Sequence, residues 1–399
     1  AYPMFDYVKA YCCGKLGDSG KESELLKSAE AQDTGCCFPA RLDDIAVLNN
    51  AICKNESGDN AYYYLGCLFY DRFAYEKATA LWEKCIALNP KHPKAFRNLA
   101  LSYFDKKGDL LSAKECMEIA LANKPDDPRL ILEYQQILRN MNYSPEHMLD
   151  FYDKYENLML LRDDCYLDKI TLKCMVGEYK EAIDMAKHRR FHIYEGGEGK
   201  LTKQHAWMHV LYGNELCRKG ELAEAEKIYK DGINMPKSYG EAKTFFNQEA
   251  HIYYYLGRLL ESEGKAASQA YAEAAVYKAA VSELSLFRAL ALRKLQSFSE
   301  AKAVLDDMES AADNFIKNCD MRTYYGVGSP SPMPFELDIV KNNLTDGYVL
   351  KAYALLGTGR FNDADEYIEK ARKLKQYDFR IYAYDNIKDS VKFDMHPKG

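Results

Sequence analysis

The sequence lacks several features that would place it in a specialised class. It has no uninterrupted apolar run near the length of roughly 18 residues that a membrane-spanning helix needs, and no basic-then-apolar leader follows Ala1. It also lacks an excess of positive charge, because its formal net charge is −6, whereas a nucleic-acid-binding surface needs clustered Lys and Arg. We therefore expect a cytoplasmic protein, or a processed piece of one, with neither membrane nor nucleic-acid partners.

Cysteine is not scarce, but the spacings that hold metals are missing. The 12 cysteines are spread along the chain, and Cys12-Cys13 and Cys36-Cys37 are adjacent pairs. Zinc sites commonly use pairs that are separated by two residues. Several cysteines also fall at expected helix-core positions, where a reduced thiol behaves as a small apolar side chain. We expect free thiols, no metal and no cofactor.

The length of the chain argues for an array rather than one compact core. At 399 residues it exceeds the size at which single cores stop growing, about 250–300 residues, so it should form several domains or a line of repeats. Its 32 tyrosines also stand out. Each offers a rigid apolar ring and a polar tip, which suits repeat cores and binding grooves alike.

Segment 59–92 has a pattern of small, aromatic and proline residues that predicts a pair of antiparallel helices. Small residues are expected where two helices meet closely, and aromatic residues fill the space between units. The marks of this unit are Tyr62, Leu65, Gly66, Phe69, Ala78, Trp82, Cys85 and Pro90. Segment 93–125 repeats the scheme with an inter-helix turn one residue longer, at 106–109, and its marks are Phe96, Leu99, Ala100, Tyr103, Ala113, Met117, Ala120 and Pro125.

Degenerate copies of the same hairpin corner recur at 177–182, 220–225, 298–301 and 359–364. Gly213 precedes Ala225 by the 12 positions that separate Gly66 from Ala78, which assigns its partner helix. These patterns are those of the tetratricopeptide repeat. They predict an all-α fold, an α-α superhelix of about eight or nine helix pairs.

The predicted organisation follows from these marks and from two interruptions. Three glycines stand near 196–199, and three prolines with two glycines stand between 326 and 334, so neither segment can be helical throughout. The predicted segments are divergent N-terminal helical pairs at 1–58, two well-matched repeats at 59–128, divergent repeats at 129–188, a Gly-rich loop at 189–205, degenerate repeats at 206–323, a Pro/Gly-rich loop at 324–336, and a last repeat with a C-terminal capping helix at 337–399.

Beyond the generic repeat, five short segments, at 37–41, 63–72, 97–100, 189–200 and 324–326, together resemble one bacterial family of large proteins. In that family an N-terminal β-sandwich domain of unknown function, similar to mutarotase-like and glycoside-hydrolase-associated folds, precedes a long tetratricopeptide region. The resemblance covers about Tyr2 to Lys373. It implies that this chain is the C-terminal repeat region of a longer protein with a carbohydrate context, and it implies no reaction.

No catalytic constellation rises above background. The run at 196–200 fails the phosphate-loop spacing, because Tyr194 and Leu201 stand where Gly and a hydroxyl residue are needed and no buried strand precedes it. With 60 acidic residues, no carboxylate pair is privileged for glycoside chemistry. Nor does the sequence contain a helical His motif for metals or a nucleophile elbow. We assign no catalytic residue and expect the isolated chain not to be an enzyme.

Binding is the better-supported class, through two candidate regions. One is the pair of loops, where charged and aromatic side chains gather beside glycines: Arg189, Arg190, His192, Glu195, Glu198, Lys200, Tyr324 and Tyr325. The alternative for the first loop is a plain turning connector. The other region is the face lined by the first helix of each pair, with Tyr63, Arg97, Asn98, Trp207, Tyr254 and Arg258. Arg and aromatic residues are common at interaction hot spots, although such tyrosines also pack between repeats.

The function predicted from the sequence is a protein-interaction or domain-docking scaffold. Its partner is expected to be a protein or peptide, and the N-terminal domain of the same polypeptide is one candidate. The alternative is a repeat region that completes a carbohydrate-binding or glycoside-processing site through its two loops. Binding of chaperone tails is disfavoured, because Tyr63 and Cys67 replace the first Lys and Asn of the clamp that resembling arrays use, and only Asn98 agrees.

Overall fold

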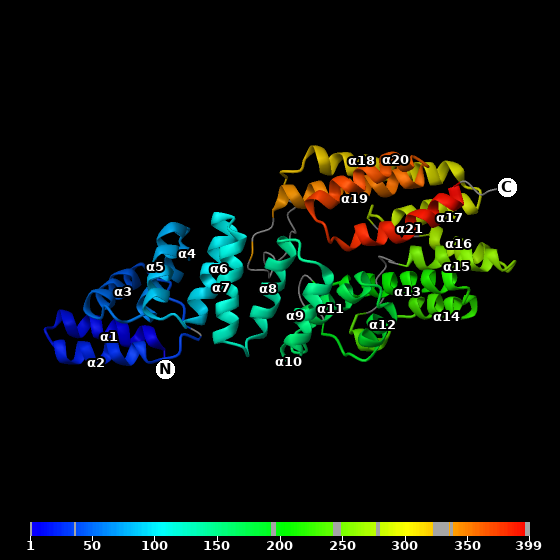
Figure 1. The fold of residues 1–399 in the computed structure, drawn as a ribbon. Helices are drawn as coiled ribbons and strands as arrows, with labels where there is room; N and C mark the ends of the chain where they lie inside the picture. Colours follow the sequence, from blue (N-terminus) through cyan, green and yellow to red (C-terminus); the bar gives the residue numbers. More distant parts are fainter. Residues whose placement is uncertain are drawn as a thin grey trace. The chain divides into compact units, whose positions relative to one another are not determined.

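The computed structural model describes residues 2–35, 37–192, 197–241, 249–276, 280–321, 335 and 338–395. Throughout these ranges the regular secondary structure is helical, and no strand occurs in them. The chain divides into two compact units, Ala1–Met141 and Asn142–Gly399. Figure 1 shows the helices along the chain.

Unit 1 consists of short helices joined by tight corners. Several helices begin with proline at their first position, where the missing N–H costs nothing. The elements are α1 (Pro3–Lys15), α2 (Ser19–Glu30), α3 (Leu42–Lys54), α4 (Asn60–Asp71), α5 (Tyr75–Leu88), α6 (Pro93–Ser102), the π-helical turn η1 (Tyr103–Lys107), α7 (Leu110–Asn123) and α8 (Pro128–Asn140).

Unit 2 contains the longer helices. Its elements are α9 (Pro145–Lys154), α10 (Glu156–Met159), α11 (Asp163–Met175), α12 (Tyr179–Lys187), α13 (Lys200–Lys219), α14 (Leu222–Ile233), the 3₁₀ turn η2 (Lys237–Tyr239), α15 (Ala250–Ser262), α16 (Ser268–Ala275), α17 (Ser285–Lys294), α18 (Phe298–Lys317), α19 (Ile339–Gly357), α20 (Phe361–Leu374) and α21 (Phe379–Met395).

Consecutive helices pack against one another as antiparallel pairs, which confirms the predicted all-α repeat architecture. Within the described ranges eight such pairs form: α1/α2, α4/α5, α6/α7, α11/α12, α13/α14, α15/α16, α17/α18 and α19/α20. In unit 2 the first helices also contact one another in the order α11, α13, α15, α17, α19 and α21. We call these six helices the first-helix layer. Its last member, α21, also contacts α11 and α13, so the layer returns on itself.

The predicted close approach within pairs is present, and an aromatic ring lies against each glycine. A Cβ on Gly66 of α4 would collide with the indole of Trp82 on α5, which is fully buried. Gly213 lies equally close to the ring of Tyr229. A Cβ on Gly257 would lie 2.6 Å from the ring of Tyr271. The glycines therefore allow a large buried ring to occupy the gap between the two helices of a pair.

The predicted corners separate the helices where the sequence places them. Gly177, Gly220 and Gly359 adopt φ values of 83°, 80° and 81°, in the left-handed region that ends helices. At the fourth corner Gln296 takes this role, with φ 62°. The extra residue predicted at 106–109 is absorbed by the π-helical turn η1, and Gly108 follows it with φ 64°.

The two predicted loops have different outcomes. Helix α13 begins at Lys200, so residues 200–205 of the predicted 189–205 loop are helical. Glu195 lies outside the described residues, as does almost all of the 324–336 loop, including Tyr324 and Tyr325. Phe335, the described residue of that loop, is buried.

Each of the eleven cysteines within the described residues is a free thiol, as expected. Five of them, including Cys85 and Cys174, are buried.

None of the described helices is both long enough and apolar enough to cross a membrane.

Replacing Gly66 with alanine tests the ring-on-glycine packing. The new methyl group would overlap the rigid indole of Trp82, so we expect Gly66→Ala to destabilise unit 1 by about 1–3 kcal/mol. The measurement is urea unfolding followed by Trp82 fluorescence in a Trp207→Phe background, since the chain has 2 tryptophans.

Gly20→Ala is the matched control, because the nearest atom to its added Cβ is 3.9 Å away. This change should leave stability unchanged or raise it by less than about 1 kcal/mol. Equal destabilisation by both substitutions would contradict the packing argument.

Candidate binding surfaces

The predicted face of unit 1 brings Tyr63, Arg97 and Asn98 onto neighbouring helices. Tyr63 is buried at 8% exposure, and its ring lies 4.9 Å from the ring of His92. Its carbonyl accepts a hydrogen bond from the Trp82 indole N–H at 3.1 Å. The Asn98 amide donates to the Cys67 sulfur at 3.4 Å. Tyr63 is therefore largely committed to packing, while Arg97 and Asn98 remain half-buried on this face.

Arg97 forms a bidentate ion pair with Glu133 of α8. Its Nε and Nη2 donate to the two carboxylate oxygens at 2.8 and 2.7 Å. Glu133 is 1% exposed and accepts a further hydrogen bond from Arg129 Nε at 2.7 Å. Burial opposes the charged guanidinium, but the hydrogen bonds and charge of Glu133 prevail and raise the pKa of Arg97. The buried Glu133 carboxylate therefore holds two arginines at the edge of the face. Their two positive charges exceed its one negative charge, so this edge carries excess positive charge.

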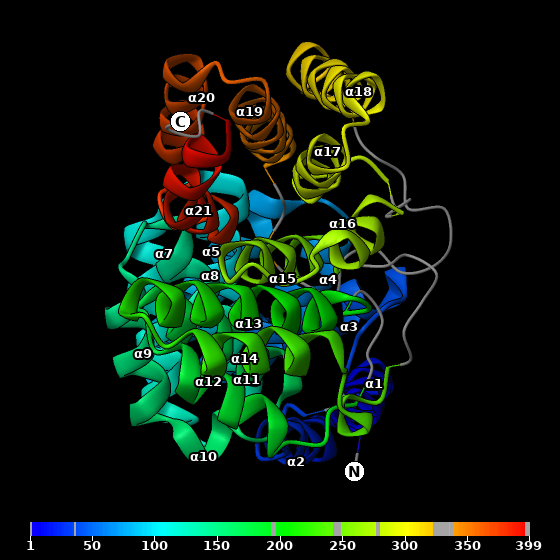
Figure 2. The same cartoon turned by 90° about the vertical axis from the view of Figure 1, so that its right-hand side faces the viewer.

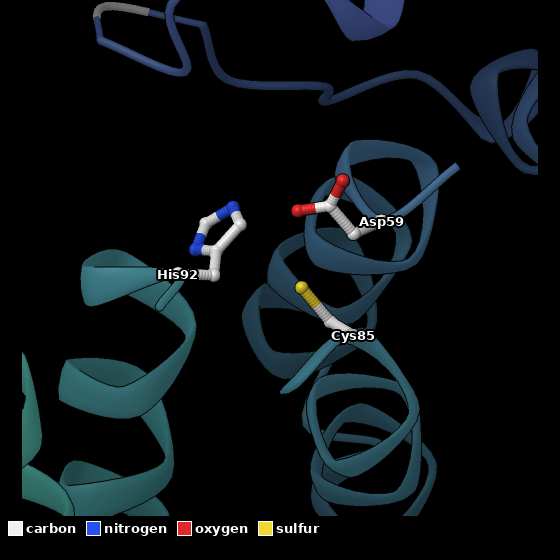
Figure 3. Close-up of side chains that lie close together, drawn as sticks. All are labelled: Asp59, Cys85 and His92. Atoms are coloured by element: carbon white, nitrogen blue, oxygen red, sulfur yellow. The ribbon is translucent and has the colours of Figure 1, made fainter. Parts of the chain in front are cut away.

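One group in the described part of the chain has ligand atoms close enough together for a metal ion. The side chains of Asp59, Cys85 and His92 place these atoms within 4.8 Å of one another (Figure 3). Asn89 donates to Asp59 at 2.7 Å, and burial raises the pKa of the Cys85 thiol, which favours its protonated form. The set has the chemistry of a soft divalent metal site, but a metal would have to replace the contacts that His92 already makes.

Those contacts of His92 belong to a buried relay that joins two helix starts. The Tyr7 hydroxyl donates to the Glu30 carboxylate at 2.6 Å, and that carboxylate accepts the backbone N–H of Asn60 at 2.9 Å. Asn60 Oδ1 lies 3.2 Å from His92 Nε2. His92 Nδ1 in turn accepts the N–H of Ala95 at 3.0 Å. The relay caps α4 and α6, so the position of His92 is explained by helix capping.

On unit 2, Trp207, Tyr254 and Arg258 lie on α13 and α15 of the first-helix layer, and α21 packs against them. Trp207 and Tyr254 are both fully buried. The Trp207 ring lies 6.2 Å from Phe379, the first residue of α21. Figure 2 shows α21 beside α13 and α15. These side chains are therefore not an open surface in this structure.

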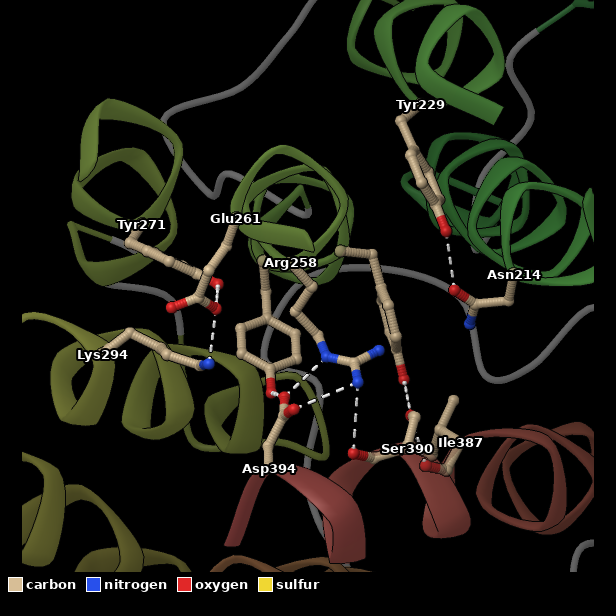
Figure 4. A network of polar contacts seen from close by, with 11 residues as sticks. Asn214, Tyr229, Arg258, Glu261, Tyr271, Lys294, Ile387, Ser390 and Asp394 are labelled. Atoms are coloured by element: carbon tan, nitrogen blue, oxygen red, sulfur yellow. Dashed lines mark hydrogen bonds and ion pairs between the residues drawn. The ribbon is translucent and has the colours of Figure 1, made fainter. Parts of the chain in front are cut away.

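The C-terminal turns of α21 are held by α15 through polar groups (Figure 4). Arg258 donates to the Asp394 carboxylate from Nε at 2.6 Å and from Nη2 at 3.0 Å. Tyr254 donates to the same carboxylate. Burial raises the pKa of Tyr254, which keeps the phenol protonated as a donor. Ser390 of α21, four residues before Asp394, accepts a hydrogen bond from the Tyr255 hydroxyl at 2.9 Å. Tyr255 is the donor because the Ser390 hydroxyl donates its own proton to the Ile387 carbonyl.

Neighbouring pairs make similar buried or half-buried polar contacts in Figure 4. Tyr229 donates to Asn214 at 2.7 Å. Tyr271 and Lys294 both donate to Glu261, at 2.8 and 2.6 Å. These contacts hold in place the rings that rest on Gly213 and Gly257. Gly257 belongs to α15, so the ring of Tyr271 packs directly against that helix.

The core of unit 2 contains three buried histidines. Burial lowers the pKa of His205 to about 2, of His209 to about 4 and of His251 to about 3. The His251 ring lies 4.5 Å from Trp207, and among the described residues neither of its nitrogens has a hydrogen-bond partner. His251 therefore stays neutral in the folded protein.

The described residues of the first predicted loop do not converge on one point. Arg189 donates to Asp163 at 2.6 Å and lies over the Tyr166 ring at 4.3 Å, and the His192 backbone N–H donates to the same carboxylate at 2.7 Å. These two residues tie the loop to the start of α11. Arg190, Glu198 and Lys200 are exposed. Whether any of them binds a ligand stays a prediction.

A cavity of about 670 Å³ lies between the start of α12 and the end of α13. Aromatic and charged side chains line it, among them Tyr179, Tyr212, Glu181 and Glu215. The sequence reasoning did not single out this cavity. Its rings and carboxylates come from a corner and from a neighbouring helix, and no local sequence pattern relates the two.

The sequence reasoning also missed the polar stripe of α21. Tyr382, Asn386, Ser390 and Asp394 recur every four residues, so they lie on one face of the helix. That regular spacing was a usable signal in a tail expected only to cap the last repeat. Its contact residues, Tyr254 and Arg258, lie more than a hundred positions away, and sequence alone does not pair them.

No family model matches the chain. Solved structures with a related arrangement include YrrB, a TPR protein with an unusual peptide-binding site, at 17% identity and TM-score 0.35, covering 49% of this chain and 93% of that one. Naa15/Naa10 bound to HypK-THB is similar at 11% identity and TM-score 0.39, covering 98% and 68%. A tetratricopeptide repeat protein from Parabacteroides merdae is similar at 16% identity and TM-score 0.30, covering 73% and 98%.

The buried histidines predict a specific pH dependence. The folded-state pKa of His251, about 3, lies below its unfolded value near 6.5, so the unfolded chain takes up the proton first as the pH falls. The stabilisation that comes from neutral His251 in the folded protein is complete above about pH 6.5. It is lost progressively at lower pH, by about 2 kcal/mol at pH 5.

His251→Phe should therefore flatten the fall in the free energy of unfolding of unit 2 between pH 6.5 and 5. The measurement is urea unfolding at several pH values, followed by Trp207 fluorescence in a Trp82→Phe background. The exposed His188→Gln serves as the control and should keep the steep dependence. A slope unchanged by His251→Phe would refute the buried neutral state.

Proposed function

We propose that this chain is a protein-interaction scaffold whose first helices bind a segment of a partner protein. The observation that carries the proposal is that one such face already holds a helix, α21, through Tyr254, Tyr255 and Arg258. The partner is a protein or peptide, and the N-terminal domain of a longer polypeptide is one candidate. We place this activity in the cytoplasm and assign no catalysis to the isolated chain.

Unit 1 supplies the more accessible candidate surface. Arg97 and Asn98 are half-buried, and Arg129 keeps 57% of its side chain exposed while it shares Glu133 with Arg97. Two guanidinium groups on one carboxylate leave a net positive charge, which suits an acidic segment. Buried Tyr63 supports the face from below. The combination of arginine with aromatic residues is the usual composition of interaction hot spots.

Site-specific cross-linking tests the scaffold role. A photoreactive benzoylphenylalanine at Leu101, on the predicted face of α6, should cross-link to a reproducible partner in cells. The same group at the exposed Glu76 on α5 should not. Excess unlabelled chain should compete for the partner, and excess Arg97→Glu chain should compete about tenfold less well, because it repels an acidic segment. The same cross-linked proteins at both positions would refute the assignment.

A carbohydrate-binding role is the second candidate, and the cavity between α12 and α13 is the observation that favours it. The half-buried Tyr212 offers a ring for stacking, and Glu181 and Glu215 offer hydrogen-bond acceptors for hydroxyl groups. None of the residues that line this cavity belongs to the two predicted loops. It would be the carbohydrate-contacting surface if the longer protein processes glycosides.

A glycan array separates this candidate from the first. If the role is real, the chain binds at least one glycan, and Tyr212→Ala weakens that binding about tenfold or more by removing a stacking ring. Arg190→Ala and Glu198→Ala test the loop at the same time, and should weaken binding only if the loop participates. Absence of glycan binding by the unaltered chain would eliminate the role.

A further inference from the structure

Helix α21 has two faces of different chemistry. Its apolar residues Ile381, Ile387 and Val391 are fully buried, as is Tyr384, whose ring lies 5.6 Å from Tyr353 of α19. This face packs on α19 and α20, as the last helix of a repeat array is expected to do. The other face is the polar stripe, which contacts the earlier repeats instead.

The polar stripe contacts the earlier repeats through separate hydroxyl groups and charged side chains. Tyr382 and Tyr179 share a hydrogen bond between their hydroxyls at 2.5 Å. Ser390 accepts from Tyr255, and Asp394 accepts from Tyr254 and Arg258. We call the Ser390 and Asp394 contacts with α15 the clasp.

The α15 side of the clasp is a built receptor for a carboxylate. Three donors from two side chains meet one carboxylate, and its position is fixed because Asp394 is 7% exposed and Arg258 is 23% exposed. Tyr255 adds a donor for a hydroxyl group one helical turn away. A partner that offers similar polar groups can replace these contacts at little net change in free energy. The apolar packing of α21 against α19 and α20 is not replaced in this way.

We propose that the C-terminal turns of α21 occupy a binding site for an acidic helix of a partner protein. That helix carries a serine or threonine four residues before an aspartate or glutamate, in the spacing of Ser390 and Asp394. The partner takes the receptor on α15 while the N-terminal turns of α21 stay anchored. That anchor is strong, because Arg380 pairs with Asp378 and with Asp346 of α19, at 2.7 Å in each case. This inference rests on the proposed scaffold function and gives the chemistry of the partner segment that binds its unit 2 face.

The probe for this site is a fluorescein-labelled peptide with the sequence Phe379–Met395, added to the full chain. The unaltered chain should bind it weakly, because its own Asp394 competes at high effective concentration. Asp394→Lys removes that competitor and keeps Arg258, so its Kd for the peptide should be about tenfold lower or better. Adding Arg258→Glu to this variant should abolish the gain.

A milder variant keeps the test decisive if Asp394→Lys fails to fold. Asp394→Asn leaves an acceptor for Tyr254 but removes the charge. Amide hydrogen exchange should then rise in Ile387–Met395 and in the last turn of α15, while α19 and α20 stay protected. Unchanged exchange in Ile387–Met395 would overturn the proposal, and so would equal peptide affinity in the unaltered and Asp394→Lys chains.

A second copy of the chain is the competing occupant. Light scattering over a range of concentrations distinguishes it, because an exchange of α21 between copies gives a dimer that the free peptide dissociates. Such a dimer would also overturn the proposal. A monomer that binds the peptide with the charge dependence described above would support it.

Discussion

In three helix pairs an aromatic ring rests on a glycine and sets the distance between the two helices, and the neighbouring helices pack at that distance. Trp82 lies on Gly66, Tyr229 on Gly213 and Tyr271 on Gly257. A larger residue at the glycine would push the helices apart, and the next pair would then lose its packing surface. Because the pairs stack only on their neighbours, the spacing set at each pair determines where the side chains of the next first helix lie.

The polar groups of the two units serve different purposes around that packing. In unit 1, Glu30 and His92 satisfy backbone donors at helix starts, and Glu133 gathers two arginines. In unit 2, Arg258 and Asp394 connect helices that are far apart in the sequence. Removing one partner of such a buried pair costs more free energy than the pair contributes, since the remaining charge is left without compensation. These pairs therefore specify geometry more than they add stability.

Sequence reasoning succeeded where the signal was local. The matched repeats at 59–125, the corners at Gly177, Gly220 and Gly359, and the longer turn at 106–109 all follow from residues within one helical hairpin. Their geometry depends on backbone conformation and on neighbours a few turns away. The start of α13 at Lys200 was placed too late, because the preceding glycines suggested a longer loop.

The candidate site was less predictable, for a physical reason. Helical phase predicts that Trp207, Tyr254 and Arg258 share one face, but it does not say what else lies there. The occupant, α21, is brought back by the accumulated rotation of several pairs, and that rotation depends on small offsets at every interface. The stripe at Tyr382, Ser390 and Asp394 was visible in the sequence, but its partners were not.

The return of α21 to α12 and α15 gives unit 2 a property that a linear array lacks. Tyr179 and Tyr382 are 203 residues apart, yet their hydroxyls share a hydrogen bond. Contacts at such separation close late in folding, because the intervening chain must be ordered first. During synthesis, α15 is complete long before Asp394 is made. The carboxylate receptor on α15 is therefore unoccupied by its own chain for that interval, and a nascent protein could meet its partner before it can meet its own tail.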